Sequence, residues 1–462
     1  EKGEQWQHAL AVMRAMECHN LEPNVIAHSA AISACERCDK MGHGLALFWE
    51  MLETDMSQTL SSSLWCLAKL SVNEPNIIKT ATVEAVSKLE SSSHPPQELS
   101  NLAWALAMLG INEPTFFDLL ADKAIASLKT FDEAELLKLA WGIAASPAAG
   151  AHLRIIQDEM VLRLNRTIID WYGHLGATRQ TFTDDIIGII WACSLDGNLN
   201  ANFVLSVRRA FGQIGRQLDI VHDMVPAKTL QSNVHTSAHI QKTPSQLWLE
   251  LEPHVVLNLP DRLVMLKPPG WEVCDKNMRF EERQLLSFLQ GELAKVWPIL
   301  HDTGFDHGFL HRLDVPSSGL VLVAKSYQAY YDLRVQLGAG NIARDYVVLC
   351  HGWMPCHRHE IKARVVWKGN LATRSGLQGK PCCTRLRVLA HASHDEDALS
   401  LVVIQIATGR RHQIRSHTSH IGHPTWCDGK YTARATHLSD LELCTWNFLH
   451  RYRLAFEDCA GV

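Results

Sequence analysis

Apolar residues follow two different spacings along this chain. Up to about residue 220 they recur at helical spacing, and similar Leu/Ala/Trp runs return at 64–68, 102–107, 139–144 and 190–193. After residue 250 they form short alternating or continuous runs, such as 319–324, which are typical of strands. We therefore expect a multidomain chain with an N-terminal all-α helical-repeat solenoid and a C-terminal α+β domain on a mainly antiparallel sheet.

The beginning of the chain contains a repeated segment. Residues 9–16 and 44–51 match at an offset of 35, and Pro23 with Asn24 separates one predicted helix from the next. This region resembles the pentatricopeptide repeat. In that family a few polar side chains per repeat read single-stranded RNA bases, and the resemblance places Asn24 and Ser29 at such positions.

The next predicted helices each carry a tryptophan among Leu and Ala, at Trp65, Trp104, Trp141 and Trp191. A turn and a second amphipathic segment follow, a pattern typical of stacked helix pairs. This part resembles the octotricopeptide class of organellar RNA-binding repeats. Because apolar residues flank these tryptophans, we expect them to pack between repeats, and a platform for stacking RNA bases is the alternative.

The helical spacing ends where Pro, Ser, Thr, Asn, His and Lys become frequent, which is typical of an exposed linker. Beyond it we expect strands at the short apolar runs and helices at 282–297 and 326–337. The predicted organisation is pentatricopeptide-like repeats over 1–56, octotricopeptide-like helical repeats over 57–220, a linker over 221–249 and the α+β domain over 250–462.

Composition narrows the class of protein. Of the 462 residues 47% are hydrophobic, which is enough for globular cores, and no apolar run approaches the roughly 18 residues of a membrane span. We therefore expect no membrane association. Thirteen cysteines without a short-spaced framework indicate free thiols in a reducing, intracellular compartment. Since the chain starts at Glu1, we expect a fragment or a processed product.

Potential metal ligands do not form a recognisable site. Cys35 and Cys38 make a lone Cys-x-x-Cys with no second pair, and the His and Asp residues between 301 and 311 fit no zinc spacing. We expect no bound metal.

Charge is distributed unevenly along the chain. Residues 1–200 carry 14 Lys and Arg against 25 Asp and Glu, a net −11, so the remaining residues carry 30 against 24, a net +6. Positions 341–420 hold twelve basic residues and five acidic ones. A polyanion such as RNA would be attracted to that stretch, whereas the acidic N-terminal half cannot grip nucleic acid non-specifically.

The strongest chemical signal lies at 311–325, which reads His-Arg-Leu-Asp, Val-Pro-Ser, Ser-Gly and an apolar run ending in Ala-Lys. A loop with Arg and Asp before a buried strand places a carboxylate at the mouth of a sheet. This sequence strongly resembles the RluA-type pseudouridine synthases. Four further segments match that family in its order, so that the resemblance covers about residues 250–458: 267–270, 344–349, 409–417 and 448–454.

The resemblance implies conversion of uridine in RNA to pseudouridine without a metal or organic cofactor, on a nucleotide flipped into a closed pocket. It makes Asp314 the catalytic carboxylate, acting on the ribose as nucleophile or as base, and the sequence leaves both roles open. Tyr346 is expected to stack on the uracil and to assist removal of the proton from the new carbon. Arg415 is expected to pair with Asp314, since a guanidinium is a fixed planar donor for a carboxylate.

The same resemblance implies contacts with RNA. Arg312 is expected to touch phosphate or to fill the gap that the flipped base leaves. The remaining residues expected to bind substrate or RNA are His311, Lys267, Arg410, Arg411, His412 and Gln413.

Alternatives stay open at this level. The chain could be a non-catalytic RNA-binding or scaffold protein that retains the synthase fold, although the presence of all three catalytic residues argues against this. The acidic helical repeats could bind a protein partner instead of RNA. The substrate could be tRNA, rRNA or an organellar transcript, and a chloroplast or mitochondrial location is expected by analogy with the repeats alone.

Overall fold

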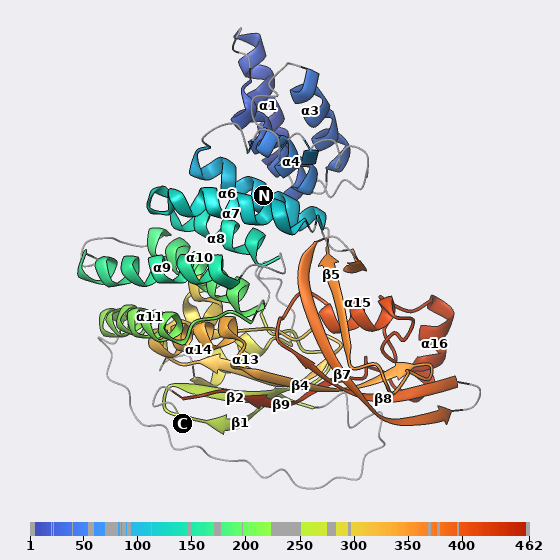
Figure 1. The fold of residues 1–462 in the computed structure, drawn as a ribbon. Coiled ribbons are helices and arrows are strands. Elements are labelled where there is room, and N and C mark those ends of the chain that lie inside the picture. Colours follow the sequence, from blue (N-terminus) through green and yellow to red (C-terminus); the bar gives the residue numbers. More distant parts are fainter. Residues whose placement is uncertain are drawn as a thin grey trace. The chain divides into compact units, whose positions relative to one another are not determined.

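A computed structural model gives the fold (Figure 1). It describes residues 5–222 and 251–458, apart from 54–59, 70–81, 86–88, 90–93, 146–149, 171–176, 275–282, 294–296, 368–370 and a few single residues and pairs. The predicted linker therefore lies almost wholly outside the described residues. The chain divides into two compact units, one of Glu1–Val204 with Arg364–Pro381 and one of Leu205–Ala363 with Cys382–Val462.

The first unit is built mainly of helices whose ends follow from the sequence. Helices α6 and α7 begin with a proline in the first turn, and Gly110, at φ +77°, ends α6. Asp132 and Glu135 form a capping box that starts α8. The helices are α1 Gln5–Cys18, α2 Val25–Arg37, α3 Met41–Glu53, α4 Leu60–Lys69, α6 Pro96–Leu109, α7 Pro114–Ala126, α8 Glu133–Ile143, α9 Gly150–Asp170 and α10 Ala177–Leu195, with a 3₁₀ turn at Leu128–Thr130.

Helices α4, α6, α8 and α10 pack against one another in that order. Trp65 contacts Trp104 at a ring-centroid distance of 6.4 Å, and Trp141 contacts Trp191 at 5.2 Å. The Lys69 ammonium lies over the first two rings. All four indoles lie at contacts between neighbouring helices, and each stays partly exposed. The N-terminal region is thus helical as predicted.

The second unit contains most of a nine-stranded sheet together with helices, an α+β arrangement as predicted. The strand order is β1-β2-β3-β9-β4-β8-β7-β5-β6. The pairs β1–β2, β2–β3, β9–β4, β4–β8, β8–β7 and β5–β6 are antiparallel, whereas β3 and β9 are parallel. The strands are β1 His254–Asn258, β2 Arg262–Lys267, β3 Ser318–Ala324, β4 Ala343–His351, β5 Glu360–Val366, β6 Arg374–Gly376, β7 Lys380–His394, β8 Asp397–Ile406 and β9 Leu449–Ala455.

Further helices complete this unit. They are α11 Ala201–His222, α13 Leu285–Leu293, α14 Tyr327–Ala339, α15 Gln413–His420 and α16 Arg434–Leu443, with 3₁₀ turns at Pro298–His301 and Thr303–Gly308. The helix expected at 326–337 is α14. Of the helix expected at 282–297, the structure shows α13, and residues 282 and 294–296 lie outside the described part of the chain.

Alternate residues of the central strands pack on both faces of the sheet. Val264 and Leu322 lie in an apolar cluster with α14, whereas Leu263 and Val321 lie in a larger cluster with α13. Period-two alternation in the sequence produces this double burial. The larger cluster also contains Leu313 and Ile414, which immediately precede Asp314 and Arg415, and Tyr346 itself. Buried neighbours therefore anchor the loops that carry the predicted catalytic residues.

Helix α11 packs with α14, although the sequence pattern placed most of it among the repeats. The Asp219 carboxylate accepts hydrogen bonds from the backbone N–H of Tyr327 (2.7 Å) and Gln328 (3.1 Å), and so caps the start of α14. Arg208 pairs with Asp332 at 2.8 Å. An amphipathic pattern shows that a helix buries one face but does not identify what covers it, which explains the difference.

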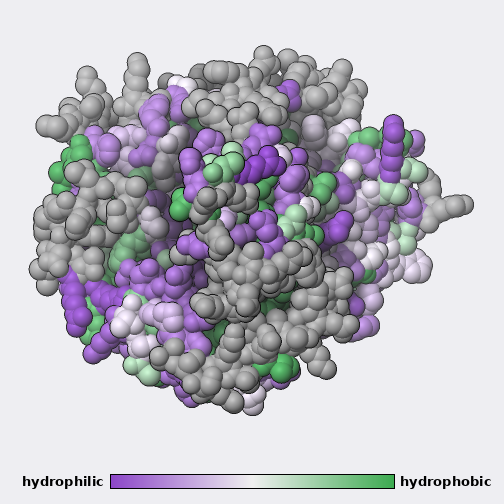
Figure 2. Space-filling view, turned by 90° about the horizontal axis from the view of Figure 1, so that it is seen from above, coloured by the Kyte–Doolittle hydropathy of each residue, from purple (hydrophilic) through white to green (hydrophobic). Residues whose placement is uncertain are grey.

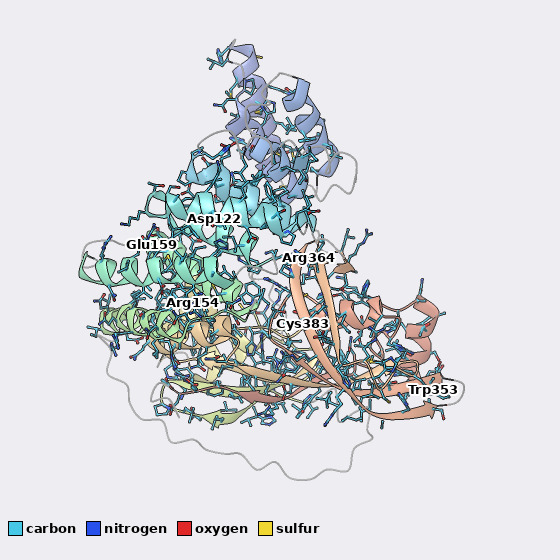
Figure 3. All side chains as sticks on the ribbon, viewed as in Figure 1. Asp122, Arg154, Glu159, Trp353, Arg364 and Cys383 are labelled. Carbon is cyan, nitrogen blue, oxygen red and sulfur yellow. The ribbon has the colours of Figure 1, made fainter. Side chains whose placement is uncertain are left out.

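Residues 364–381 belong to the helical unit, although the segments before and after them belong to the second unit. Arg364, labelled in Figure 3, donates from Nη1 to the Ala107 carbonyl at 2.7 Å, and the Gly379 N–H donates to the Met108 carbonyl at 3.3 Å. Both acceptors are close to the C-terminal end of α6, where carbonyl groups lack partners within the helix.

On the face drawn in Figure 2, apolar residues occur in small groups among hydrophilic ones, as is usual for folded proteins. Among the described helices, none combines the length and the apolar character that crossing a membrane requires.

Candidate active site

Asp314 lies in the loop before β3, and its side chain is 22% exposed. The Ser317 N–H donates to the Asp314 carbonyl, which closes a turn. Gly319, at φ +121°, lies so close to the Arg451 backbone on β9 that a Cβ there would collide with it. Glycine at this position therefore lets β3 start beside β9, directly after the loop that carries Asp314.

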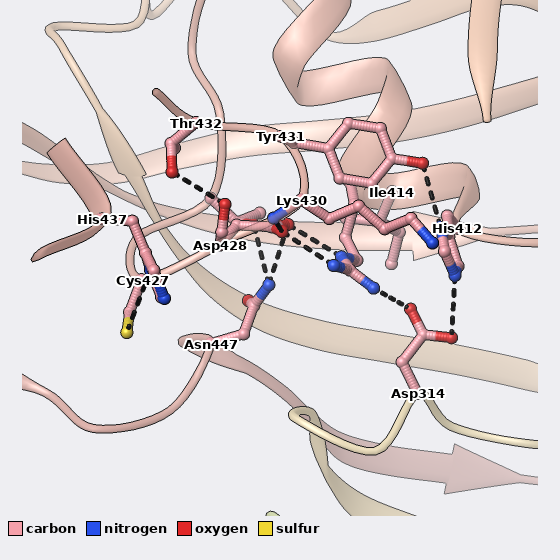
Figure 4. Close-up of polar contacts among 12 residues, drawn as sticks. Asp314, His412, Ile414, Cys427, Asp428, Lys430, Tyr431, Thr432, His437 and Asn447 are labelled. Carbon is pink, nitrogen blue, oxygen red and sulfur yellow. Dashed lines mark hydrogen bonds and ion pairs between the residues drawn. The ribbon is translucent and has the colours of Figure 1, made fainter. Parts of the chain in front are cut away.

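Arg415 on α15 is 6% exposed and holds two carboxylates at once (Figure 4). Its Nη1 donates to Asp314 Oδ2 at 2.6 Å, while Nε and Nη2 each donate to Asp428 at 2.7 Å. Burial alone would lower the pKa of Arg415, but its hydrogen bonds to Asp428 and the charges of Asp428 and Asp314 raise it above its ordinary value. The predicted pairing of Arg415 with Asp314 is thus present.

Asp428 is the functional residue that the sequence analysis missed. Its Oδ2 also accepts from Thr425 Oγ1 and Asn447 Nδ2, both at 2.9 Å, and its Oδ1 accepts from the Lys430 N–H at 3.1 Å. Burial raises the pKa of this carboxyl, but the Arg415 guanidinium outweighs burial and holds it below its ordinary value. The only sequence signal was its place in a segment that matches the synthase family.

His412 and Tyr431 lie on the other side of Asp314. His412 Nε2 is 3.8 Å from Asp314 Oδ1, and its Nδ1 shares a hydrogen bond of 3.0 Å with the Tyr431 hydroxyl. The Arg415 guanidinium lies 5.1 Å from the centre of the Tyr431 ring. Burial, aided by the charges of Arg415, Lys430 and Arg411, lowers the pKa of His412 to about 4. A neutral imidazole therefore faces the Asp314 carboxylate at neutral pH.

Tyr346 is 3% exposed on β4 and is held by a buried arginine. Arg451 donates to the Tyr346 hydroxyl from Nε (2.9 Å) and Nη2 (2.5 Å), and its guanidinium lies 5.0 Å from the centre of that ring. Within the described residues no hydrogen bond joins Tyr346 to Asp314. The apolar cluster that contains Tyr346 also contains Leu313, the residue directly before Asp314.

Three residues expected to bind RNA have internal partners instead. Lys267 is fully buried, and its Nζ donates to the carbonyl groups of Pro268 (3.0 Å), Trp271 (2.7 Å) and Val315 (3.2 Å). Burial lowers its pKa to about 7. The prediction for Lys267 was wrong, because a sequence motif gives a residue's type but not its burial. This lysine fastens the loop after β2 to the loop of Asp314.

Gln413 is also buried, and the half-buried His311 has an internal partner as well. Gln413 is 2% exposed and joins Thr408 Oγ1 (2.7 Å) to the Cys383 carbonyl (3.0 Å), which fixes the start of α15. His311 accepts from Arg451 Nη1 at 2.8 Å, and burial together with that guanidinium and Arg344 keeps its pKa well below its ordinary value.

The three arginines expected to contact RNA differ in exposure. Arg312, directly before Leu313 and Asp314, is exposed, whereas Arg410 and Arg411 are half-buried. Burial lowers the pKa of Arg410 to about 9. Arg312 is therefore the best placed of the three to meet a phosphate.

In the part of the chain that the structure describes, no group of three or more His, Cys, Asp or Glu residues is arranged to hold a metal ion. What the geometry provides is one partly exposed carboxylate, oriented by a buried guanidinium and bordered by a neutral imidazole and an apolar core. Such a carboxylate can act on a substrate as a nucleophile or as a base.

Comparisons with known proteins match the C-terminal part of the chain. Residues 262–420, which include Asp314, Tyr346 and Arg415, match the family model for RNA pseudouridylate synthase. This part of the chain is therefore similar to the pseudouridine synthases that the ordered motifs resemble.

Individual relatives cover parts of this chain. It is 30% identical over 215 residues to ribosomal large subunit pseudouridine synthase C of Haemophilus ducreyi, which is 45% of this chain and 62% of that protein. It is 29% identical over 199 residues to RNA pseudouridylate synthase domain-containing protein 1 of Danio rerio, 39% of this chain and 64% of that one. The chain thus spans less than two thirds of either relative. A solved structure of human RNA pseudouridylate synthase domain containing 1 matches with a TM-score of 0.36 and 24% identity, over 44% of this chain and 78% of that one.

Proposed function

We propose that this protein is an RNA pseudouridine synthase in which Asp314 is the catalytic residue. The observation that carries the proposal is the 2.6 Å bond from Arg415 to Asp314, in a segment that matches the pseudouridylate synthase family. The reaction breaks the bond between N1 of uracil and C1′ of ribose and joins C5 to C1′. The proton on C5 leaves and N1 gains one, so no atom is added overall.

The residues divide the work as follows. Asp314 attacks C1′ or removes the proton from C2′, and Arg415 holds its carboxylate in position. The detached uracil turns between apolar side chains that keep water out, with Tyr346 against its face. Arg312, exposed at the mouth of the loop, meets the RNA backbone beside the flipped nucleotide.

Ribosomal RNA is the first substrate to test. Several of the matched relatives are named as ribosomal large subunit pseudouridine synthases, which supports this choice. The basic stretch at 341–420 supports binding of RNA through phosphate contacts.

For the helical unit we propose recognition of the substrate or of a protein that delivers it. Successive packing of α4, α6, α8 and α10 supports a repeat array, and the net charge of −11 over residues 1–200 favours a protein partner over non-specific RNA binding. A chain of residues 201–462 distinguishes these roles. Unchanged KM for naked RNA supports protein docking, whereas a raised KM supports RNA recognition.

Release of tritium from RNA labelled at C5 of uridine tests the main proposal, because that label leaves only when C5 bonds to C1′. We expect release by the parent protein from at least one of the rRNA, tRNA and mRNA pools, and none by Asp314→Ala. Asp397→Ala, at an exposed aspartate on β8, is the matched control and should release label at the parent rate. RNA binding without release by the parent would favour the non-catalytic scaffold.

A further inference from the structure

We propose that Asp440 is a positioning residue for the synthase reaction: it holds the Cys427 backbone in the conformation that aims Asp428 at Arg415. This inference rests on the proposed function, since its effect on rate requires that Arg415 and Asp314 carry the chemistry. It concerns a buried carboxylate that the mechanism above does not use.

The first step is the backbone at Cys427. Its φ is +55°, in the left-handed region that costs a residue with a side chain free energy relative to glycine. Asp428 follows directly and carries both hydrogen bonds to Arg415. Relaxation of φ at Cys427 would therefore swing the Asp428 carboxylate away from the guanidinium.

The second step is the group that opposes this relaxation. The Cys427 N–H donates to Asp440 Oδ2 at 2.8 Å, and Asp440 on α16 is completely buried. His351 Nε2, at the end of β4, donates to the same oxygen at 3.1 Å. The other oxygen, Oδ1, has no hydrogen-bond partner within the described residues. Asp440 thus acts through a single oxygen that receives two donors.

The third step is the rigidity of the frame around this oxygen. The His351 ring stacks on the Trp426 ring at a centroid distance of 4.5 Å, and the backbone N–H of Trp426 donates to the Leu349 carbonyl at 2.8 Å. Trp426 and Cys427 form an apolar cluster with Leu399, against which Leu441 of α16 packs. The frame fixes both ends of the bond from Cys427 to Asp440. This bond holds the backbone of Cys427 itself, whereas Thr425 and Asn447 hold the Asp428 carboxylate that follows.

Two substitutions at Asp440 separate positioning from general stability. Asp440→Asn keeps an oxygen for the Cys427 N–H and places its NH₂ at the unpartnered position, whereas Asp440→Leu has similar volume and no acceptor. We expect kcat of Asp440→Leu to fall about 10- to 100-fold with KM nearly unchanged, because misplacement of about 1 Å costs that much. Asp440→Asn should stay within about threefold of the parent. Glu442→Leu, at an exposed acid on the same helix, is the control and should be unchanged.

A suppressor sharpens the test. Glycine at 427 removes the cost of the left-handed backbone, so Cys427→Gly added to Asp440→Leu should restore about fivefold in kcat. Loss of stability alone predicts no such recovery. Should Asp440→Leu fail to fold, Cys427→Val and Cys427→Gly test the same joint with Asp440 intact, and only Val should lower kcat.

The proposal is overturned if Asp440→Leu keeps the parent kcat, if Asp440→Asn loses as much as Asp440→Leu, or if glycine at 427 restores nothing. Failure of the proposed function is a separate result, namely that the parent makes no pseudouridine. In that case hydrogen exchange of residues 424–431 tests whether Asp440 holds the Cys427 backbone. Faster exchange in Asp440→Leu than in Asp440→Asn supports this role, and equal exchange overturns it.

Discussion

Arg415 donates hydrogen bonds to two carboxylates, those of Asp314 and Asp428, and Asp428→Asn tests how far its position depends on the second. The Asp428 side chain is fully buried, the Arg415 side chain is 7% exposed, and two bonds of 2.7 Å join them. Asparagine offers one oxygen and turns its NH₂ toward the guanidinium, so one charge-assisted bond and the compensating charge are lost. Breaking a buried ion pair lowers the free energy of unfolding by about 3–5 kcal/mol. Because one hydrogen bond remains, we expect Asp428→Asn to lose about 3 kcal/mol.

The pH dependence follows from the direction of the pKa shift. Folding lowers the pKa of Asp428, so its stabilisation is complete above the unfolded pKa near 3.8 and is lost as pH falls through the lower folded value. Urea unfolding of parent and Asp428→Asn should therefore differ by about 3 kcal/mol at pH 7, with the gap narrowing below about pH 4. The kcat of Asp428→Asn should also fall about 10- to 100-fold, since Arg415 is less constrained.

The control for this experiment is Asp397→Asn, at an exposed site that should change the free energy of unfolding by less than about 0.5 kcal/mol. A gap between parent and Asp428→Asn below about 1 kcal/mol at pH 7 would refute the reasoning, because the buried guanidinium would then not depend on its second carboxylate.

Three further outcomes are expected. Burial lowers the pKa of Lys267 to about 7, whereas the unfolded side chain titrates at about 10.4, so the free energy of unfolding should rise from about pH 7 to 10. Urea titrations at several pH values should show this rise in the parent protein and not in Lys267→Met. A chain of residues 250–462 lacks the Asp219 cap and the Arg208 pair, so it should unfold at lower urea than a chain of 201–462, and equal midpoints would contradict the role of α11. Arg312→Ala should raise KM about tenfold. The slope of log KM against log salt concentration should fall by about 1, the value for one lost phosphate contact, whereas an unchanged slope would exclude that contact.

The sequence predicted the pairing of Asp314 with Arg415 because both residues sit in segments with a strong family resemblance. Asp314 and Arg415 are 101 residues apart, and the resemblance of their segments to the family implied their contact. Asp428 also lies in the stretch that resembles the family, but the resemblance assigned it no role. Asp428 matters because it is buried and accepts from three donors besides Arg415. No periodic pattern of apolar residues around it indicates this burial, so a single sequence does not reveal it.

Burial also explains the errors. Lys267 and Gln413 are polar residues beside the motifs, and by type alone they are plausible contacts for RNA. Tertiary packing places each among internal acceptors or donors, where a lysine with three carbonyl partners organises a loop and does not bind ligand. Helix α11 is a similar case, since its apolar stripe was visible but its partner, α14, was not.

The most direct test of the central claim is the pseudouridine content of rRNA digested to nucleosides after single-turnover reaction with parent protein or Asp314→Asn. Asparagine keeps the size of the side chain and an acceptor for Arg415 but cannot act as nucleophile or base. The account predicts pseudouridine formation by the parent and a rate at least about 10³-fold lower for Asp314→Asn, with RNA affinity nearly unchanged. A rate within about tenfold of the parent would contradict the assignment of Asp314 as the catalytic carboxylate.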